Sequence, residues 1–476
     1  MAGISRRQFV RTLVGTVAVG LYGGLLAACA PGQQPSAAQQ TPKPAEAAPT
    51  PKTKGVEAIP PTPVKVEVKP GQTLIEYWHN MGVGLSLDVH MKQIQMFEEK
   101  FPQYKVNPVY VPTQAGTQLS DKLLAAVTGG NPPDAARFDR FLVTSWAARG
   151  FLEELTDYAK RDGVTEDKFI KEGWLEATWK GKVYAVPFDT DLRALYYNKK
   201  HMEEAGLDPN KPPRTIEELD MMAEKCTKKE GAKYTRLGFI PWFKQGHIYT
   251  WGWVFGGEFY DRQANKFTAS HPRIVKALEW MVSYAKKYQI DAIDSFAQAF
   301  GPNENDPFIA GLVTFVSDGD WMVANNLKYR KPEEKDIWDV VPYPQGPDNA
   351  PYPVTWGGGW STVLPKGAKQ KEPGWALAKF LGTDVAHIYA IETTHIPVYL
   401  PAYDELEKNK EKFDPRWIKF WPLRSNARFR PNIPAGQEAW SELSKARDLA
   451  IHFKGEPAAL LKQVDEVVNR ELAKYQ

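Results

Sequence analysis

Cysteine is scarce in this sequence, because the 476 residues include only Cys29 and Cys226. So few thiols exclude a disulfide-rich scaffold and a zinc site built from paired CxxC motifs. Charge of one sign is lacking as well, since 60 basic and 57 acidic residues leave a formal net charge of +3. A chain this close to neutral has no broad face for nucleic acid, so we expect no nucleic-acid partner.

Motifs of catalysis and of cofactor binding are also missing. The sequence contains no HExxH, GxSxG or Walker pattern, and Gly82-Val83-Gly84 lacks the third glycine of a dinucleotide-binding loop. The histidines are scattered, so we expect neither a cofactor nor a metal site built on them. One loop, Asn303-Glu304-Asn305-Asp306, carries oxygen ligands suited to calcium without the spacing of an EF-hand, which leaves calcium binding there open.

Aromatic side chains, in contrast, are abundant, with 16 Trp, 20 Tyr and 22 Phe. Such side chains build cores, and they can also line a binding cleft. Hydrophobic residues make up 43% of the chain and charged residues 25%, which is the balance of a globular protein. The length allows two or three domains of ordinary size.

The N-terminus has the pattern of an export signal. Arg6, Arg7 and Arg11 form a positive segment, and the uncharged stretch from Leu13 to Ala28 is shorter than the about 20 apolar residues of a membrane-spanning helix. The pattern therefore predicts a secretion signal, with an uncleaved membrane helix as the alternative. Ser5-Arg6-Arg7-Gln8-Phe9-Val10 resembles the twin-arginine export motif.

The end of this segment, Leu26-Ala27-Ala28-Cys29, resembles the bacterial lipobox. That resemblance implies cleavage before Cys29 and attachment of lipid to its thiol, which anchors a protein to a membrane surface. Residues 1–28 are thus predicted to be a signal peptide, and residues 29–71 a tether that begins with the lipidated Cys29. The tether is rich in proline and alanine and has too few large apolar side chains to fold. Without the arginines of the signal, the mature chain is formally neutral.

Strand and helix patterns alternate from residue 73 onward. We expect strands at 73–78, 106–111 and 134–138, and helices at 85–100 and 118–128. This order predicts an α/β fold with a parallel sheet, in which ligands bind beyond the carboxyl ends of the strands. Trp78, His79, Asn80 and Asp139 lie at such ends. Further along, helical spacing places Cys226 on an apolar face, so its thiol is predicted to be buried and inert.

An ordered series of segments carries a family resemblance over residues 72 to 476. The segments are 122–126, 129–134, 146–155, 181–187, 195–199, 204–208, 212–215, Asp318-Gly319-Asp320-Trp321 and Trp356-Gly357-Gly358-Gly359-Trp360. In this order and spacing they resemble the family 1 extracellular solute-binding proteins, the sugar-binding subunits of bacterial ABC importers. The maltose- and glycerol-phosphate-binding proteins are relatives.

The resemblance implies a two-lobed α/β periplasmic-binding-protein fold with a multi-pass hinge, which closes on its ligand in the manner of a Venus flytrap. By the family's pattern, residues 72–188 and 355–395 form the N-lobe. Residues 189–354 and 396–476 form the C-lobe.

A sugar-binding site needs aromatic faces for the C–H surfaces of the ring and planar polar groups for its hydroxyls. Matching the sequence to the family implies that the following residues lie near the cleft: Trp78, His79, Asp139, Asp189, Trp253, Trp321, Gly358 and Trp360. Trp251, Trp356 and Asp191 suit the same chemistry, and Gly357, Gly358 and Gly359 would let backbone amides approach the ligand. Core packing is expected instead for four tryptophans in amphipathic helices: Trp146, Trp280, Trp375 and Trp440.

Two functions remain open from the sequence. The first is an extracytoplasmic, lipid-anchored receptor, a monomer and not an enzyme, that binds a sugar, oligosaccharide or polyol and delivers it to an ABC permease. The alternative is an anchored glycoside hydrolase that uses Asp189 and Asp191, although carboxylates two residues apart on an extended segment lie only about 7 Å apart on one face. A phosphorylated ligand would need basic side chains such as Arg193, Arg424 and Arg428, whereas the neutral mature chain favours an uncharged ligand.

Overall fold

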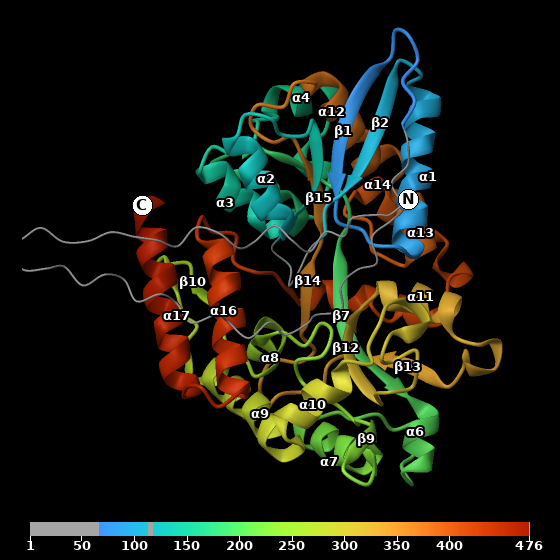
Figure 1. Ribbon diagram of the computed structural model, residues 1–476, viewed down its shortest axis with the longest axis vertical. Helices are drawn as coiled ribbons and strands as arrows, with labels where there is room; N and C mark the ends of the chain where they lie inside the picture. The colour runs from blue at the N-terminus through green and yellow to red at the C-terminus, as the bar shows by residue number, and fades with distance from the viewer. Residues whose placement is uncertain (1–65, 113–117, 476) are drawn as a thin grey trace, which may run out of the picture. The chain divides into compact units, whose positions relative to one another are not determined.

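The computed structural model describes residues 66–112 and 118–475, all of which belong to one compact unit, Lys54–Gln476 (Figure 1). The predicted signal peptide, the lipobox with Cys29 and most of the tether lie outside the described residues. Within the described ranges, no helix combines the length and the apolar character that a membrane span requires.

Two separate sheets organise the chain. The first sheet has five strands in the order β2 (Tyr104–Tyr110), β1 (Thr73–His79), β3 (Ala135–Asp139), β15 (Trp360–Val363) and β6 (Ala185–Pro187). β1 pairs in parallel with both β2 and β3, as the alternating pattern predicts, with Ile75 opposite Val106 and Tyr77 opposite Ala135. β15 comes from much later in the sequence and runs antiparallel to β3 and β6, so the sheet is mixed.

Helices cover both faces of this first sheet. They are α1 (Leu85–Lys100), α2 (Gln118–Thr128), α3 (Val143–Ala148), α4 (Thr156–Asp162), α5 (Lys171–Glu176), α12 (Lys371–Lys379) and α13 (Ala386–Thr393). Because side chains alternate along a strand, neighbouring residues of β3 enter different cores. Ala135 packs in a core with Phe97 and Trp375, whereas Ala136 packs in another with Leu123 and Trp146.

The second sheet contains β12 (Phe315–Gly319), β7 (Asp191–Asn198), β14 (Thr355–Gly358) and β16 (Ala427–Arg428), with β13 (Trp338–Val341) also paired to β7. All residues of β7 are buried, as befits its central place. The α-helices not yet described all follow β7 in the chain and are α6 (Lys199–Glu204), α7 (Ile216–Cys226), α8 (Ile248–Val254), α9 (Pro272–Tyr288), α10 (Ile290–Ala297), α11 (Trp321–Tyr329), α14 (Leu400–Lys408), α15 (Pro415–Ile418), α16 (Gly436–Ile451) and α17 (Pro457–Leu472). Three short hairpins complete the described strands: β4 (Thr178–Trp179) with β5 (Lys182–Val183), β8 (Lys228–Glu230) with β9 (Lys233–Arg236), and β10 (Tyr260–Asp261) with β11 (Lys266–Phe267).

Local sequence signals place α7 as expected. Thr215 caps the helix, because its hydroxyl oxygen accepts a hydrogen bond from the backbone N–H of Glu218 at 3.2 Å. The Glu218 carboxylate bonds the N–H of Arg214 at 2.6 Å, one residue before the cap. At the other end of α7, Cys226 is fully buried, and burial raises the pKa of its thiol to about 11. The prediction of a buried, unreactive thiol is therefore confirmed.

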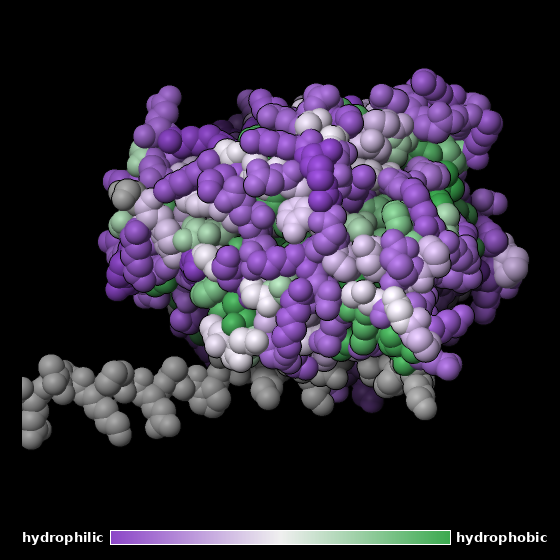
Figure 2. Space-filling model, turned by 90° about the horizontal axis from the view of Figure 1, so that it is seen from above, coloured by the Kyte–Doolittle hydropathy of each residue, from purple (hydrophilic) through white to green (hydrophobic). Residues whose placement is uncertain are grey.

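The surface presents few large apolar side chains. In the view of Figure 2, hydrophilic residues cover most of the face, and the apolar areas between them are small and separate. The exposed large apolar residues of the described chain are Val68, Leu74, Val83, Leu175, Met221, Tyr352, Ile391 and Phe453. Single exposed apolar residues of this kind are normal for a folded protein and need no partner.

The chain passes between the two sheets at closely spaced points. Phe188–Thr190 joins β6 to β7, and Gly359 alone joins β14 to β15 (Figure 1). Near the first crossing, Thr190 forms a backbone bridge with Ile396, which brings a third segment beside it. Because β14 pairs with β7, this part of the chain returns to the first sheet at Trp360.

A buried arginine ties the first two crossings together. Arg140 has no solvent exposure, and its guanidinium donates to the backbone oxygens of Asp189 and, at 2.8 Å, of Gly358. Its Nε donates to the Glu176 carboxylate at 2.9 Å. Burial raises the pKa of Glu176, and the charge of Arg140 opposes that shift. The charge is thus neutralised inside the protein while the guanidinium bridges both crossings.

Replacing this arginine should destabilise the protein strongly. For Arg140→Met we expect the free energy of unfolding in urea to fall by about 3–5 kcal/mol, because Glu176 would keep a buried carboxylate without its partner. The matched control is Arg161→Met, which removes a half-exposed pair with Glu372 and should cost less than about 1 kcal/mol. Equal losses in the two variants would show that Arg140 does not hold the crossings.

Candidate functional site

The ends of the two sheets meet at one group of polar and aromatic side chains, which we call the junction. Its members are Arg137, Asp139, Phe141, Asp189, Asp191, Arg193, His247, Trp321, Trp356, Gly358, Trp360, Arg430 and Trp440. They come from β3 and the turn after it, the first crossing, β7, β14, β15, the starts of α8 and α11, and the segment around the start of α16. Residues more than 200 positions apart in the sequence, such as Asp139 and Arg430, therefore lie within a few ångströms of each other.

Arg430 joins the two sides of the junction directly. Its guanidinium donates to the Asp139 carboxylate at 2.7 Å and lies 3.6 Å from the centre of the Phe141 ring. Asp139 is the last residue of β3, and its carboxylate also accepts from the N–H of Phe141 at 3.4 Å. The segment that follows Arg430 continues the contact, since Gln437 accepts from the Trp146 indole at 3.3 Å.

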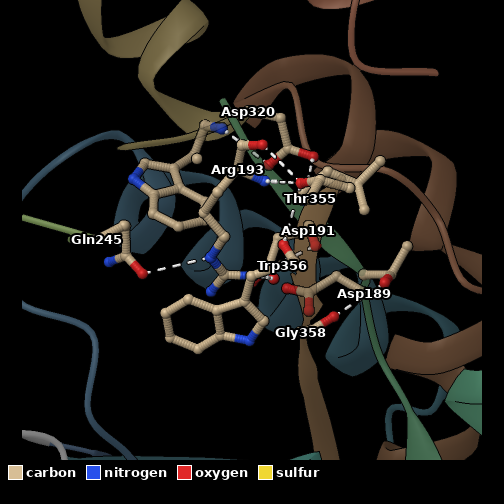
Figure 3. A network of polar contacts seen from close by, with 12 residues as sticks. Asp189, Asp191, Arg193, Gln245, Asp320, Thr355, Trp356 and Gly358 are labelled. Carbon is tan, nitrogen blue, oxygen red and sulfur yellow. Dashed lines mark hydrogen bonds and ion pairs between the residues drawn. The ribbon is translucent and has the colours of Figure 1, made fainter. Parts of the chain in front are cut away.

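Arg193 occupies the corresponding place on the second sheet (Figure 3). It pairs with the Asp191 carboxylate, and its Nε donates to Gln245 at 3.3 Å. The guanidinium lies 4.1 Å from the ring centre of Trp356 and 5.3 Å from that of Trp321, so aromatic faces flank the cation. Burial alone would raise the pKa of Asp191, but Arg193 and the other nearby positive charges together outweigh burial and lower that pKa.

Two further carboxyl groups at the junction carry no such partner. Asp320 caps α11, where its carboxyl oxygens accept from the N–H groups of Trp321 at 3.0 Å and Leu192 at 3.3 Å. Burial, reinforced by the charge of Asp191, raises the pKa of Asp320 well above the ordinary value. For Asp189, burial raises the pKa to about 7 against the opposing charge of Arg137. These groups are costly to ionise without a partner.

Five of the eight residues expected near the cleft lie at the junction: Asp139, Asp189, Trp321, Gly358 and Trp360. The three others are not among its members, although His79 lies near Arg137. Trp78 is half-buried and its indole donates to Glu76 on its own strand at 2.9 Å. His79 is buried, and desolvation together with the charge of Arg137 lowers its pKa to about 4. Trp253 is buried in the core of the second sheet, where it packs on Tyr249 and Phe259.

Close steric contacts explain why glycines stand between Trp356 and Trp360. A Cβ at Gly358 would meet the Asp191 carboxylate at 2.8 Å and the Arg193 guanidinium at 2.9 Å. A Cβ at Gly359 would meet the backbone oxygen of Asp189 at 2.3 Å, and its φ of +150° disfavours any other residue. Within this structure, the absence of side chains makes room for the ion pair and the crossing.

Trp440 packs against two of the cores, as expected, but sequence reasoning missed its place at the junction. It is half-buried, stacks on the His247 ring with 4.1 Å between ring centres, and lies 5.9 Å from Phe141 and 6.1 Å from Trp356. A signal was available, because the buried stripe of α16 runs through Ala439, Leu443, Ala446 and Ala450 and leaves Trp440 outside it.

Arg137 and Arg430 were missed as well. Arg137 stands between Ala136 and Phe138 in the buried part of β3, and a charged residue in such a place is itself a signal. The arginines considered for a phosphate are placed differently. Arg193 is already paired, Arg424 stacks on Tyr403 away from the junction, and Arg428 pairs with Glu258 at 3.4 Å on the surface.

In the loop considered for calcium, the Asp306 carboxylate is paired with a lysine side chain of the protein. The Asp306 carboxylate accepts from the Lys244 ammonium at 2.6 Å, and the same ammonium lies 3.3 Å from Asp318. Asn303–Asn305 forms a short 3₁₀ turn before Asp306. Among the described residues, no group of three or more His, Cys, Asp or Glu side chains is arranged to hold a metal ion.

Comparisons with known proteins give the same architecture. A maltotriose-binding protein of Pyrococcus abyssi is 23% identical over 397 residues, which cover 80% of this chain and 78% of that protein. The sn-glycerol-3-phosphate-binding periplasmic protein of Escherichia coli K12 is 26% identical over 344 residues, or 70% of this chain and 76% of that protein.

Solved structures with bound sugars are also similar. The mannobiose-bound structure of CpMnBP1 superposes with a TM-score of 0.75 at 27% identity, covering 83% of this chain and all of that one. Maltose-bound MalE3 of T. maritima superposes with a TM-score of 0.70 at 25% identity, covering 84% of this chain and all of that one. These likenesses confirm the predicted two-lobed α/β periplasmic-binding-protein fold, in which the two sheets belong to the two lobes.

The family match decides between the two functions that the sequence left open. Asp189 and Asp191 are tied to Trp360 and Arg193, and the matching family consists of transport receptors, so the alternative of a glycoside hydrolase is set aside. Residues 78–387, which are most of the chain, match this family along both sheets, and the chain belongs to the bacterial extracellular solute-binding proteins.

Proposed function

We propose that this protein is an extracytoplasmic receptor that binds an uncharged carbohydrate at the junction and delivers it to an ABC import permease. The observation that carries the proposal is the meeting of aromatic faces with hydrogen-bonding side chains from both lobes. Trp356 and Trp440 come from the second lobe, and Phe141 and Trp360 from the first. This mixture suits a sugar ring, which has apolar C–H faces and a rim of hydroxyls.

The charges at the junction favour an uncharged ligand over a phosphorylated one. A phosphate is bound most strongly by arginines that are free to form two parallel hydrogen bonds with it. Arg140, Arg193 and Arg430 are each already engaged by a carboxylate, at Glu176, Asp191 and Asp139. The buried carboxyl groups of Asp189 and Asp320 lie in the same region.

The relatives include proteins named for uncharged sugars and one named for a phosphorylated ligand, so the charge argument is needed to choose between the two ligand classes. The protein from Pyrococcus is named for maltotriose and the solved relatives contain mannobiose or maltose, whereas the Escherichia coli relative is named for glycerol 3-phosphate. Within that set, the paired arginines support a disaccharide or a short oligosaccharide for this chain. The residues proposed to contact it are Asp139, Asp189, Trp321, Gly358 and Trp360 from the sequence-based set, together with Trp356, Arg430 and Trp440.

Delivery to a permease requires a receptor that stays near the membrane. The lipobox-like segment before Cys29 and the proline-rich tether after it support lipid anchoring of the mature protein on the outer side of the cell membrane. Cys226 is the other thiol of the chain and is buried, so it does not compete for modification. Export through the twin-arginine route is proposed on the residues around Arg6 and Arg7.

Carbohydrate binding can be measured by calorimetry and tryptophan fluorescence. We expect mannobiose, mannotriose, maltose or maltotriose to bind without being cleaved, and sn-glycerol 3-phosphate not to bind. Trp440→Ala should weaken saccharide binding by roughly tenfold, which corresponds to the ~1.4 kcal/mol of one lost aromatic contact. Tyr352→Ala, which changes a half-exposed residue away from the junction, is the matched control. Binding of the phosphate alone, or cleavage of a saccharide, would contradict the proposal.

Lipid anchoring can be tested in the cell by fractionation. Wild-type protein should sediment with membranes, whereas Cys29→Ser should appear in the soluble extracytoplasmic fraction because it has no thiol for the lipid. Cys226→Ser is the control and should remain with the membranes. If Cys29→Ser still sediments after a carbonate wash, the anchor is not a lipid on this thiol.

A further inference from the structure

We propose that Arg137 and Asp189 act together as a hydroxyl-binding pair that selects an uncharged sugar over an anionic one. The inference rests on the proposed function and deepens it, because it assigns specificity to two named side chains. Arg137 was not among the residues expected at the site from the sequence.

Arg137 differs from the three other arginines near the junction. Among the described residues, no carboxylate lies within ion-pair distance of it, whereas Arg140, Arg193 and Arg430 each have one. Its Nη1 donates to the side-chain oxygen of Asn80 at 2.7 Å, and the guanidinium centre lies 3.6 Å from the ring centre of Trp360. The side chain is only 6% exposed, and its buried Nε has no hydrogen-bond partner in the described chain.

Asp189 complements Arg137, because it has a buried acceptor oxygen that lacks a donor. One carboxyl oxygen accepts from the backbone N–H of Trp360 at 2.7 Å, and the other is buried with no partner among the described residues. The residue is 2% exposed and belongs to the first crossing. Trp360 therefore contacts both members of the pair, Arg137 through its ring and Asp189 through its backbone.

A donor and an acceptor that are buried and unsatisfied in one place specify the chemistry of the group that would satisfy both. The Arg137 Nε–H needs an acceptor, and the free Asp189 oxygen needs a donor. A hydroxyl group is both, and neighbouring hydroxyls of a pyranose can serve the two side chains at once. A phosphate dianion can only accept, and it would add negative charge beside Asp189 and Asp191.

A ligand can reach these atoms only when the two lobes separate. The contact between Arg430 and Asp139 spans the lobes at 2.7 Å, with Arg430 5% exposed and Asp139 20% exposed. Hinge opening would break this contact, while Arg140 keeps the crossings in place. Reclosure would then bury the sugar hydroxyls against Arg137 and Asp189, where water no longer competes for their hydrogen bonds.

The ionisation of Asp189 also makes the affinity for the ligand depend on pH. Burial raises the pKa of Asp189 to about 7, so the carboxyl is half-protonated near neutral pH. A hydroxyl that donates to the free oxygen favours the ionised carboxylate, so binding releases a proton. Affinity should therefore increase about tenfold from pH 6 to pH 8 and level off above the pKa of free Asp189.

Other titratable and charged groups surround Arg137 and Asp189. Burial lowers the pKa values of His79 and His395 to about 4 and raises those of Tyr77 and Tyr389 above the range from pH 6 to pH 8. The charges of Arg137, Asp191 and Arg140 act on Asp189, and the pKa of Asp191 is lowered. Burial also raises the pKa of Asp320, so Asp320→Asn serves as the control for its contribution.

The test is calorimetry with mannobiose on the mature chain at pH 6, 7 and 8, with mannotriose, maltose and maltotriose as further probes. The variants are Arg137→Met and Asp189→Asn, and the controls are Arg262→Met and Asp404→Asn, at exposed positions away from the junction. We expect wild type and both controls to show the tenfold increase with pH. Asp189→Asn should bind with a flat pH profile, and Arg137→Met should bind roughly 10- to 100-fold more weakly.

Deoxygenated analogues of the bound saccharide identify the hydroxyl concerned. One analogue should lose affinity with wild type but lose little more with Arg137→Met, because the contact is already absent in the variant. Circular dichroism and urea unfolding check that the variants fold. If Arg137→Met does not, Arg137→Lys keeps the positive charge without the planar Nε–H and should give the same loss.

The outcomes separate this inference from the proposed function. If saccharides bind to wild type and the folded variants bind equally well with the same pH profile, the pair has no part in recognition and only the inference is wrong. If no saccharide of the panel binds to wild type at any pH, the proposed function fails, and the inference fails with it. If Asp189→Asn gains binding of sn-glycerol 3-phosphate, that result supports the selection against anions.

Discussion

The buried guanidinium of Arg140 is the interaction on which the rest of the junction depends. It bridges the backbone oxygens of Asp189, in the first crossing, and of Gly358, the last residue of β14 before the second crossing, and Glu176 neutralises it from the first lobe. A cation so far from water is tolerated only because all these partners are in place. The crossings are thereby held side by side, although each consists of only one to three residues outside the strands.

The spacing set by that bridge decides which side chains face the junction. Asp189 directs its carboxyl group toward Trp360, and two residues later Asp191 turns to Arg193 across the space left by Gly358. A single polar run of the sequence thus supplies one carboxylate to each lobe. Their different partners push the two pKa values apart, so that only Asp189 can change its charge near neutral pH.

The parts of the fold that depend on local patterns could be predicted from the sequence. The parallel pairing around β1, the cap of α7 and the burial of Cys226 follow from periodicity and short-range hydrogen bonds. Contacts across the junction could not be predicted in this way. Trp253 and Trp440 both lie in helices rich in aromatic neighbours, and only the packing of α16 against the first lobe distinguishes them.

The arrangement of charges at the site could not be predicted from the net charge of the sequence either. The neutrality of the mature chain suggested an uncharged ligand, yet a net charge is compatible with any local arrangement. The structural reason lies in the pairing of Arg140, Arg193 and Arg430 with carboxylates, whereas Arg137 has no ion pair and Asp189 keeps a buried oxygen without a partner in the described chain. Selectivity for hydroxyls would then arise from two incomplete partners at Trp360, because a neutral group that both accepts and donates is the one that completes them without adding charge.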